Sequence, residues 1–345
     1  MLLMSRIFYC VIFVIVGWIF PAIPQASADV WDLSRESPKL EKLQKNISKD
    51  QCKIGVSIYE LYEFDYSSHT FDADFLIWSL CWSLPTKHHL EELDYMNSIT
   101  IRAGPIKTVY KKNYIHSYRR VIGNFHHLWN LKAFPFDDQT LILLIGSASW
   151  DSHSIDYHLD FKSSELHDFH YSNIWDVKSF TGEISKGHPQ TTYGNPSIDQ
   201  SELFSRIAVS VDITRESTAV FWRLTVGVFS AVLVMMMTFF VHPKIDALHN
   251  AQLALIIGSL FSVLMSYRNV GDYLGYAERL SLIDGVHIGG IFFILIAGSA
   301  AVIKRYLVCH MNVTIKHPDL RGLSLYVLSY ILFNVGVFVW ATQTT

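Results

Sequence analysis

The chain has 345 residues, a formal net charge of -3, a hydrophobic fraction of 50% and a charged fraction of only 17%. This profile is too apolar for a disordered or nucleic-acid-binding protein and points to a membrane protein. The apolar residues are unevenly distributed, because residues 29–217 are rich in Asp, Glu, His and Tyr, whereas residues 218–345 hold long runs with almost no charge. We therefore expect two compartments in one chain, a lipid bilayer around the second, and no nucleic-acid partner.

Residues 1–28 have the order of features that export machinery reads in a signal peptide. Arg6 precedes an apolar run at residues 7–20, and small residues at 26–28 end the segment. The run is short for a membrane span, which needs about 20 residues. We predict a cleaved signal peptide and export of the chain from Asp29 onward; an uncleaved first membrane helix is the alternative.

The exported part of the chain has too few cysteines for a disulfide framework. Cys10 belongs to the predicted signal peptide and Cys309 ends an apolar run, so only Cys52 and Cys81 remain in the exported part. These two can form one disulfide, but nothing in the sequence requires it.

Residues 29–217 read as β-strands, because apolar and aromatic residues alternate with polar ones between Gly, Pro, Asn and Ser clusters. Along residues 74–82, Trp78 and Trp82 lie on one face. Phe75 lies on the other, so both faces are apolar, as in a sandwich strand. The predicted elements are a short amphipathic helix within residues 31–49 and strands that include residues 56–61, 74–82, 140–147 and 207–213. We predict an antiparallel, Ig-like β-sandwich for this domain.

Residues 218–345 contain four apolar segments that predict a four-helix transmembrane bundle. The predicted spans are residues 219–241, 248–268, 282–308 and 321–342. The second span is less apolar because it carries Ser259, Ser262 and Ser266, and polar groups at membrane depth normally face a bundle interior or water. The loops expected on the cytoplasmic side carry the basic residues, which are Lys244, Lys304, Arg305, Lys316 and Arg321.

Signals of an enzyme are weak. Among the 16 histidines, His88-His89 and His126-His127 are adjacent pairs and not spaced metal ligands. The motifs HExxH, CxxC, GxSxG and the phosphate-binding loop do not occur in the sequence. We expect no catalytic residue, no metal site and no cofactor. Proton sensing by outward-facing histidines is an alternative to solvated loop histidines, since imidazole titrates near physiological pH.

The most specific signal is the stretch Leu-Lys-Ala-Phe-Pro-Phe-Asp-Asp-Gln-Thr-Leu at residues 131–141. It resembles the Phe-Pro-Phe-Asp-x-Gln loop of the pentameric ligand-gated ion channels, the family that includes the Cys-loop neurotransmitter receptors. The exported sandwich, the loop and four spans occur in the family's order, so the resemblance covers nearly the whole mature chain. It implies a homopentamer in which a small-molecule ligand binds between exported domains and opens a central pore for a permeant ion.

Two departures from the animal receptors resemble the bacterial branch of the family. His127 and Leu141 stand where the animal receptors have two bridging cysteines, and the loop at residues 309–319 is far shorter than the animal intracellular domain. The resemblance therefore implies a multi-pass protein of the cell inner membrane, with residues 29–217 in the periplasm.

The resemblance also implies a coupling interface between the two domains. Arg215 matches the family arginine just before the first span, and in the family that arginine pairs with the loop aspartate, here Asp137. The alternative is that Arg215 only extends its side chain to the membrane surface. The implied coupling residues, which act together with a linker at residues 267–282, are Phe134, Pro135, Phe136, Asp137, Gln139 and Arg215.

The second span lines the pore in the family, and its register carries over without gaps. The implied pore-lining residues are Asn250, Ala254, Gly258, Phe261, Met265 and Arg268. Helical periodicity supports this register only in part, because Gly258 and Met265 fall at the edge of the arc of the helix surface that the other pore-lining residues share. Serines on the opposite face can bond to backbone carbonyls one turn back. Charge selectivity stays open, since Arg268 favours anions whereas Asp246 can provide a negative ring inside.

Aromatic residues between neighbouring sandwiches form the family's ligand site. The candidates are Trp78, Trp82, Trp150 and Tyr193, and for each of them a place in the core is the ordinary alternative. Trp150 lies two residues after the tryptophan position of animal receptors, so an amine ligand is not implied. A membrane-anchored receptor or sensor that passes no ions is the rival function, motivated by Ala254, Gly258 and Phe261 in the pore.

Overall fold

The computed structural model describes residues 50–82, 90–91, 93–147, 155–167, 175–187, 204–215, 218–275, 280–311, 313 and 319–343. The chain divides into two units, Met1–Ile47 and Ser48–Thr345, and all the described residues belong to the second. The expected signal peptide and the amphipathic helix within residues 31–49 lie outside the described residues.

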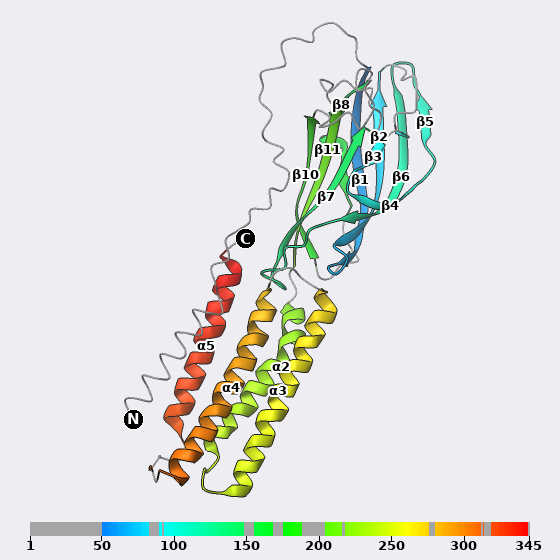
Figure 1. Cartoon of the computed structure of the whole chain (residues 1–345). Helices are drawn as coiled ribbons and strands as arrows, with labels where there is room; N and C mark the ends of the chain where they lie inside the picture. Colours follow the sequence, from blue (N-terminus) through cyan, green and yellow to red (C-terminus); the bar gives the residue numbers. More distant parts are fainter. Residues whose placement is uncertain are drawn as a thin grey trace, which may run out of the picture. The chain divides into compact units, whose positions relative to one another are not determined.

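The N-terminal part of the second unit is a β-sandwich, as predicted (Figure 1). A seven-stranded sheet has the order β4-β6-β2-β1-β8, with β5 beside β6 and β9 beside β1, and a four-stranded sheet has the order β10-β11-β7-β3. The strands are β1 (Asp50–Asp65), β2 (Thr70–Cys81), β3 (Leu93–Tyr95), β4 (Ser98–Ala103), β5 (Lys107–Tyr110), β6 (Ile115–His126), β7 (Asp138–Ser147), β8 (Ile155–Leu159), β9 (Glu165–Leu166), β10 (Trp175–Gly187) and β11 (Phe204–Arg215), with a short 3-10 helix η1 (Phe161–Ser163) before β9.

The seven-stranded sheet is mixed, which corrects the antiparallel prediction. β1 pairs with β2 in the antiparallel sense but with β8 and β9 in the parallel sense. The chain crosses from β7 in one sheet to β8 at the edge of the other. Alternation of side chains reports which face of a strand is buried and does not encode the direction of pairing, so the sequence could not reveal this.

One face of β2 packs in the core and the other faces outward. Phe75 and Ile77 are fully buried, whereas Trp78 is half-buried on the outer face. Cys52 and Cys81 are register partners on β1 and β2, and they form a disulfide, which answers a question that the sequence left open.

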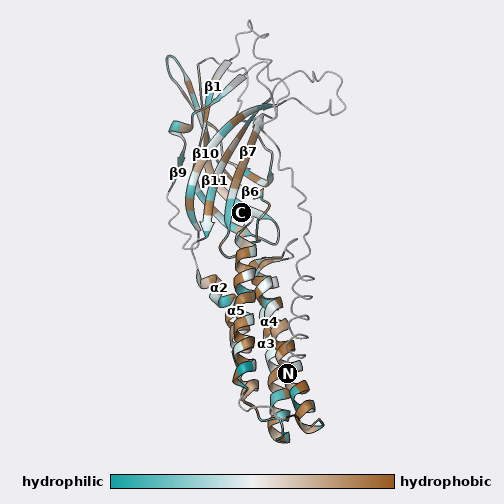
Figure 2. Ribbon diagram, turned by 90° about the vertical axis from the view of Figure 1, so that its left-hand side faces the viewer, coloured by the Kyte–Doolittle hydropathy of each residue, from teal (hydrophilic) through white to brown (hydrophobic). Residues whose placement is uncertain are grey.

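Four helices come after the sandwich, at the places predicted for spans. They are α2 (Thr218–Met236), continued by the 3-10 helix η2 (Met237–Phe240), α3 (Asp246–Leu274), α4 (Leu282–Cys309) and α5 (Leu320–Thr342). Each is long and apolar enough to cross a membrane, which supports a multi-pass membrane protein. Hydrophobic residues dominate these helices, whereas the strands contain both hydrophobic and hydrophilic residues (Figure 2).

α3 is longer than predicted, because it continues past Arg268 to Leu274. The extension contains no proline and passes through Gly271, and it ends at Gly275, whose φ of 68° glycine adopts without strain. The linker to α4 is therefore shorter than the expected residues 267–282.

α4 is the helix that the others pack around, and glycines let two of them approach closely. A Cβ atom at Gly289 would lie 2.1 Å from the Phe333 ring of α5, and one at Gly290 would lie 2.4 Å from Val228 of α2. Small residues at such contacts are typical of helices that associate in lipid.

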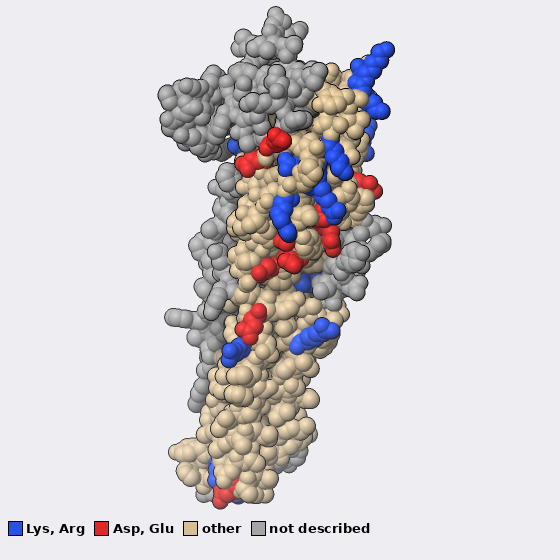
Figure 3. Space-filling model, turned by 90° about the vertical axis from the view of Figure 1, so that its right-hand side faces the viewer, with Lys and Arg blue, Asp and Glu red and all other residues tan. Residues whose placement is uncertain are grey.

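On the face shown in Figure 3, charged side chains gather over the strands and at the ends of the helices.

Candidate functional site

The loop that contains the Phe-Pro-Phe-Asp sequence at residues 134–137 encloses an ion pair where the sandwich meets the helices. Arg215 Nε donates to Asp137 Oδ1 at 3.0 Å, and the two side chains are 0% and 1% exposed. Arg215 Nη2 donates to Tyr66 Oη at 2.7 Å, and the guanidinium lies over the rings of Phe134 at 4.7 Å and Trp175 at 4.3 Å. The structure thus brings the two predicted partners together and places Arg215 inside the junction, not at the membrane surface.

Electrostatics keep Arg215 charged. Burial alone would lower the pKa of Arg215, but Asp137 and Tyr66 outweigh it and raise the pKa above its ordinary value. Burial also raises the pKa of Tyr66 to about 12, so the phenol stays protonated and can accept from Arg215 without becoming an anion. The arrangement is a buried ion pair lined by aromatic rings.

Further polar contacts extend from the pair into the sandwich. Asp137 Oδ2 accepts from Gln139 Nε2 at 2.8 Å, and Gln139 Oε1 accepts from the backbone N–H of Asn130 at 3.1 Å. The same oxygen lies 3.4 Å from Nε2 of His127, whose ring contacts Trp129 with centroids 4.4 Å apart. Burial lowers the pKa of His127 to about 4, so this histidine is neutral at physiological pH.

The loop contacts all four helices, which makes it the physical connection between the two domains. The Phe134–Pro135 peptide bond is cis, and Phe134 is fully buried. The contacts are Phe134 with Tyr273 of α3, Phe136 with Phe221 of α2 and Phe338 of α5, and Lys132 with Leu282 of α4 and Trp340 of α5.

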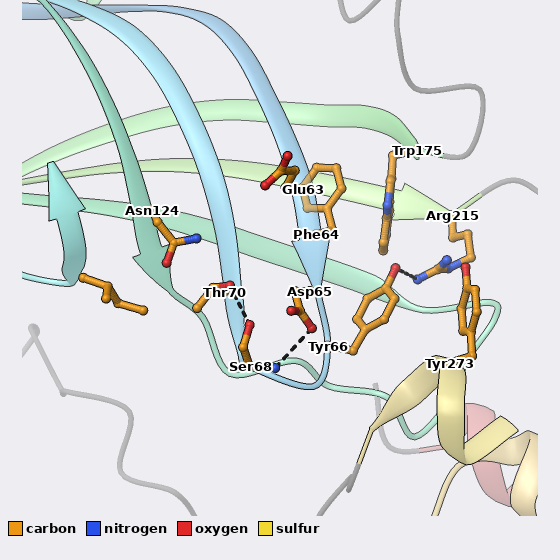
Figure 4. Close-up of a pocket in the computed structure, with 11 residues that line it drawn as sticks. Glu63, Phe64, Asp65, Tyr66, Ser68, Thr70, Asn124, Trp175, Arg215 and Tyr273 are labelled. Carbon is orange, nitrogen blue, oxygen red and sulfur yellow. Dashed lines mark hydrogen bonds between the residues drawn. The ribbon is translucent and has the colours of Figure 1, made fainter. Parts of the chain in front are cut away.

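A cavity of about 740 Å³ opens beside the junction (Figure 4). Its lining includes Glu63 and Asp65 of β1, Trp175 of β10 and Tyr273 of α3. Hydrogen bonds from Ser67 and Ser68 lower the pKa of Asp65 to about 2, so its carboxylate is charged at neutral pH. Arg215 also lines the cavity, so both signs of charge and aromatic rings meet there. Across the described ranges, no cluster of His, Cys, Asp and Glu could hold a metal ion.

α3 has one packed side and one open side. The packed side carries the buried residues Gln252, Ser259, Val263, Val270 and Leu274. At about 100° per residue, the predicted pore residues fall on the opposite side, and all are exposed in the single chain: Asn250, Ala254, Gly258, Phe261, Met265 and Arg268. Phe261 is 61% exposed although it lies in the middle of a membrane-length helix.

The polar residues of α3 differ from expectation in two places. Ser266 Oγ lies 3.1 Å from the Leu224 carbonyl of α2, a neighbouring helix, and so does not bond one turn back as predicted. Asp246 pairs with Arg305 of α4 at 2.5 Å, although the sequence suggested a free carboxylate ring. Both contacts join residues on different helices, 42 and 59 positions apart in the sequence, which periodicity cannot reveal.

Sequence reasoning missed Asp272. This carboxylate is exposed on the open side of α3, one turn beyond Arg268. The absence of proline between Arg268 and Gly275 was the signal that could have found it.

The ligand candidates lie partly outside the described residues, since Trp150 and Tyr193 are not among them. Neither Trp78 nor Trp82 belongs to the core. The Trp78 ring lies over Gly55, where a Cβ atom would be 2.2 Å away, and Trp82 is 50% exposed with Lys53 Nζ 5.7 Å from its ring centroid. The outer face of the larger sheet therefore presents aromatic rings that a ligand or a second subunit can contact.

Comparison with known proteins gives one short similarity. No family model matches the chain. Over 57 residues, the chain is 38% identical to the acetylcholine receptor subunit beta-type acr-2 of Caenorhabditis elegans. The match covers 16% of this chain, and it spans about a tenth of the length of that curated relative. Together with the sandwich and four helices of membrane length, this similarity supports a channel-like receptor and favours a receptor over an enzyme.

Proposed function

We propose that the chain is a subunit of a homopentameric ligand-gated ion channel of the bacterial inner membrane. Its sandwich faces the periplasm, a small molecule binds between neighbouring sandwiches, and the central pore is lined by α3. Ligand binding shifts a closed-to-open equilibrium because the ligand has different affinities for the two states.

The observation that carries this proposal is the open side of α3. Polar residues lie at both ends of that side, with Asn250 near the start and Arg268 and Asp272 near the end. In a single chain these groups would face hydrocarbon, where charges are expensive. A closed ring of identical subunits places them around water, and head-to-tail contacts related by rotation close such a ring.

The pore would be narrowest at Phe261. Five copies of this ring form an apolar constriction that gates by dewetting. Closer to the outer mouth, rings of Arg268 and Asp272 stand one turn apart and carry opposite charges. We expect these two rings to act in opposite directions on charge selectivity.

The junction supports transmission from sandwich to pore. A loop that contacts every helix, and whose Asp137 is paired with the last residue of β11, transfers a movement of the sandwich to the helices. We propose Phe134, Pro135, Phe136, Asp137, Gln139 and Arg215 as the coupling residues, and Trp78, Trp82, Trp150 and Tyr193 as ligand contacts.

Reconstitution in planar bilayers tests the proposal. Currents would be recorded while small amines, carboxylates and pH steps are screened under sodium and chloride gradients. Phe261→Ala should abolish or reshape the current, whereas Leu255→Ala, which changes α3 outside the pore arc, should leave gating close to that of the unchanged chain. Arg268→Gln and Asp272→Asn should move the reversal potential in opposite directions.

A non-conducting receptor with the same fold is the second candidate. The exposed apolar Phe261 and the small residues Ala254 and Gly258 favour it, because they supply no polar group to the inner half of the pore. Ligand binding by an intact pentamer, with no current from either the unchanged chain or Phe261→Ala, would support this receptor and contradict the channel.

A further inference from the structure

The cavity beside the domain junction has no part in the proposed function. Its walls come from both sheets of the sandwich and from α3, and its volume of about 740 Å³ is enough for a small molecule. Glu63 and Asp65 of β1 are exposed, whereas Arg215 of β11 is buried. Tyr273, near the end of α3, completes the lining (Figure 4). We call this space the junction cavity.

Arg215 brings to this cavity a buried N–H group that lacks a partner. Its Nε donates to Asp137 and its Nη2 donates to Tyr66, but its Nη1 has no hydrogen-bond partner in the described part of the chain. A buried donor without an acceptor costs free energy, and the cost is larger for a charged group. Because Asp137 already matches the charge of Arg215, Nη1 lacks an acceptor and not a counter-ion. A neutral oxygen atom bound in the cavity can supply that acceptor.

The two carboxylates of the cavity lack a cation. Among the described residues, neither Glu63 nor Asp65 forms an ion pair. Asp65 Oδ1 accepts from the backbone N–H and the hydroxyl of Ser67 at 2.8 and 2.7 Å, and from the backbone N–H of Ser68 at 3.1 Å. These donors hold the carboxylate in place, but all of them are neutral. The negative charge of Asp65 is therefore not compensated, and a cationic group would gain from contact with it.

Aromatic rings form much of the remaining wall. The ring centroids of Phe64 and Trp175 are 5.8 Å apart, and those of Tyr66 and Tyr273 are 6.1 Å apart. Ring faces attract cations. Tyr273 stays 44% exposed despite its contact with Tyr66, so part of its ring is open to a molecule in the cavity. Such a molecule would contact the sandwich and α3 at the same time.

We propose that the junction cavity binds a small organic cation that carries a neutral acceptor oxygen, such as an amino amide. The ammonium group pairs with Glu63 and Asp65, and the amide oxygen accepts from Arg215 Nη1. A carboxylate in place of the amide is disfavoured, because the two carboxylates of the cavity and Asp137 already outnumber the single guanidinium. Occupancy holds Tyr273, and with it α3, against the sandwich. Only the consequence for gating rests on the proposed function.

A ligand-observed NMR titration of the full chain in lipid nanodiscs measures this binding without a current. The probe β-alaninamide carries both groups, whereas propylamine lacks the acceptor oxygen and propanamide lacks the ammonium group. We expect propylamine to bind about tenfold more weakly than β-alaninamide, and propanamide about fivefold more weakly. β-Alanine, which has a carboxylate in place of the amide, should also bind more weakly than β-alaninamide.

Two substitutions locate the bound molecule. Glu63→Gln removes a charge from the cavity and should weaken the binding of β-alaninamide about fivefold, with no effect on propanamide. Tyr273→Leu removes the ring that α3 contributes and should weaken β-alaninamide about threefold. Glu183→Gln makes the matched change at an exposed carboxylate of β10 outside the lining and should bind as the unchanged chain does. If Tyr273→Leu fails to fold, Glu63→Gln alone decides.

The outcomes distinguish this inference from the proposed function. Absence of binding, equal affinities for β-alaninamide and propylamine, tighter binding of β-alanine, or an unchanged affinity in Glu63→Gln would overturn the cavity site, even if the chain conducts. Loss of binding in Trp82→Ala would overturn it as well, because that ring is a proposed ligand contact outside the cavity. The expected pattern in a pentamer that passes no current would contradict the channel and leave the cavity site standing.

Discussion

At the domain junction a buried ion pair stands among neutral polar groups, whereas the buried polar side chains described within the helices are all neutral, and most of them bond to backbone carbonyls. Arg215 and Asp137 are both enclosed and charged. In the helices, Gln252 Nε2 donates to the Thr238 carbonyl at 3.1 Å, and Ser266 reaches the Leu224 carbonyl. The difference arises from the surroundings. A charged group in hydrocarbon is costly, whereas a backbone carbonyl satisfies a polar side chain without adding a charge.

This contrast indicates where each region is vulnerable. A buried ion pair depends on both partners, since removing one leaves an uncompensated charge. A helix bundle held by close packing depends on the space between the helices. The two regions should therefore respond to different substitutions.

The largest effect is expected at the ion pair. Asp137→Asn keeps the shape of the side chain but leaves Arg215 charged and buried, which should lower the free energy of unfolding by about 3 kcal/mol. Thermal unfolding in detergent measures this loss. Ligand-evoked current should fall as well, because the junction would no longer transmit the movement of the sandwich.

An exposed ion pair next to the junction supplies the control. Lys178 Nζ lies 2.7 Å from Asp138 Oδ1, and the two side chains are 52% and 55% exposed. Lys178→Ala should cost less than about 1 kcal/mol, because solvent screens this pair. Equal losses from Asp137→Asn and Lys178→Ala would show that burial of the pair does not matter.

Close packing between α4 and α5 is expected to give the next largest effect. Gly289→Ala places a methyl group where a Cβ atom would lie 2.1 Å from the Phe333 ring, so α5 must shift. We expect a loss of about 2 kcal/mol in stability. Thermal unfolding of the reconstituted chain measures it.

Gly336→Ala on α5 is the matched control, because a Cβ atom there would meet nothing within 4 Å. Alanine has the higher helix propensity, so this variant should be as stable as the unchanged chain or slightly more stable. If both variants unfold at the same temperature, the close contact between Gly289 and Phe333 does not limit the stability of the chain.

Much of the fold could be predicted from the sequence, because its signals are local. Alternation along residues 74–82 and 207–213 located β2 and β11, and apolar runs located the four helices. The predicted end of α3 is too early, because the charge of Arg268 suggests the limit of a span, whereas the helix continues through Asp272.

The candidate site was predictable only where a resemblance supplied the pairing. Asp137 and Arg215 are 78 positions apart, and no periodicity joins them. The contact between Ser266 and His287 has no such guide, because the two residues lie on different helices and meet only after these pack. The sequence predicts two apolar faces for β2, but apolar content does not distinguish a buried face from one that awaits a partner.

The smallest effect is a response of the junction to acid. His127 has a pKa of about 4 in the folded junction and 6.5 as its ordinary value, so the unfolded chain binds the proton first. Its contribution to stability is complete above pH 6.5 and is lost as the pH falls towards 4. By pH 5 we expect a loss of about 1 kcal/mol, allowing for partial exposure of the ring.

Thermal unfolding at both pH values, monitored by circular dichroism of the sandwich, measures this loss. His127→Gln should remove the acid sensitivity, and His126→Gln, which changes the exposed neighbour, should retain it. If the acid sensitivity persists in His127→Gln, His127 is not its source.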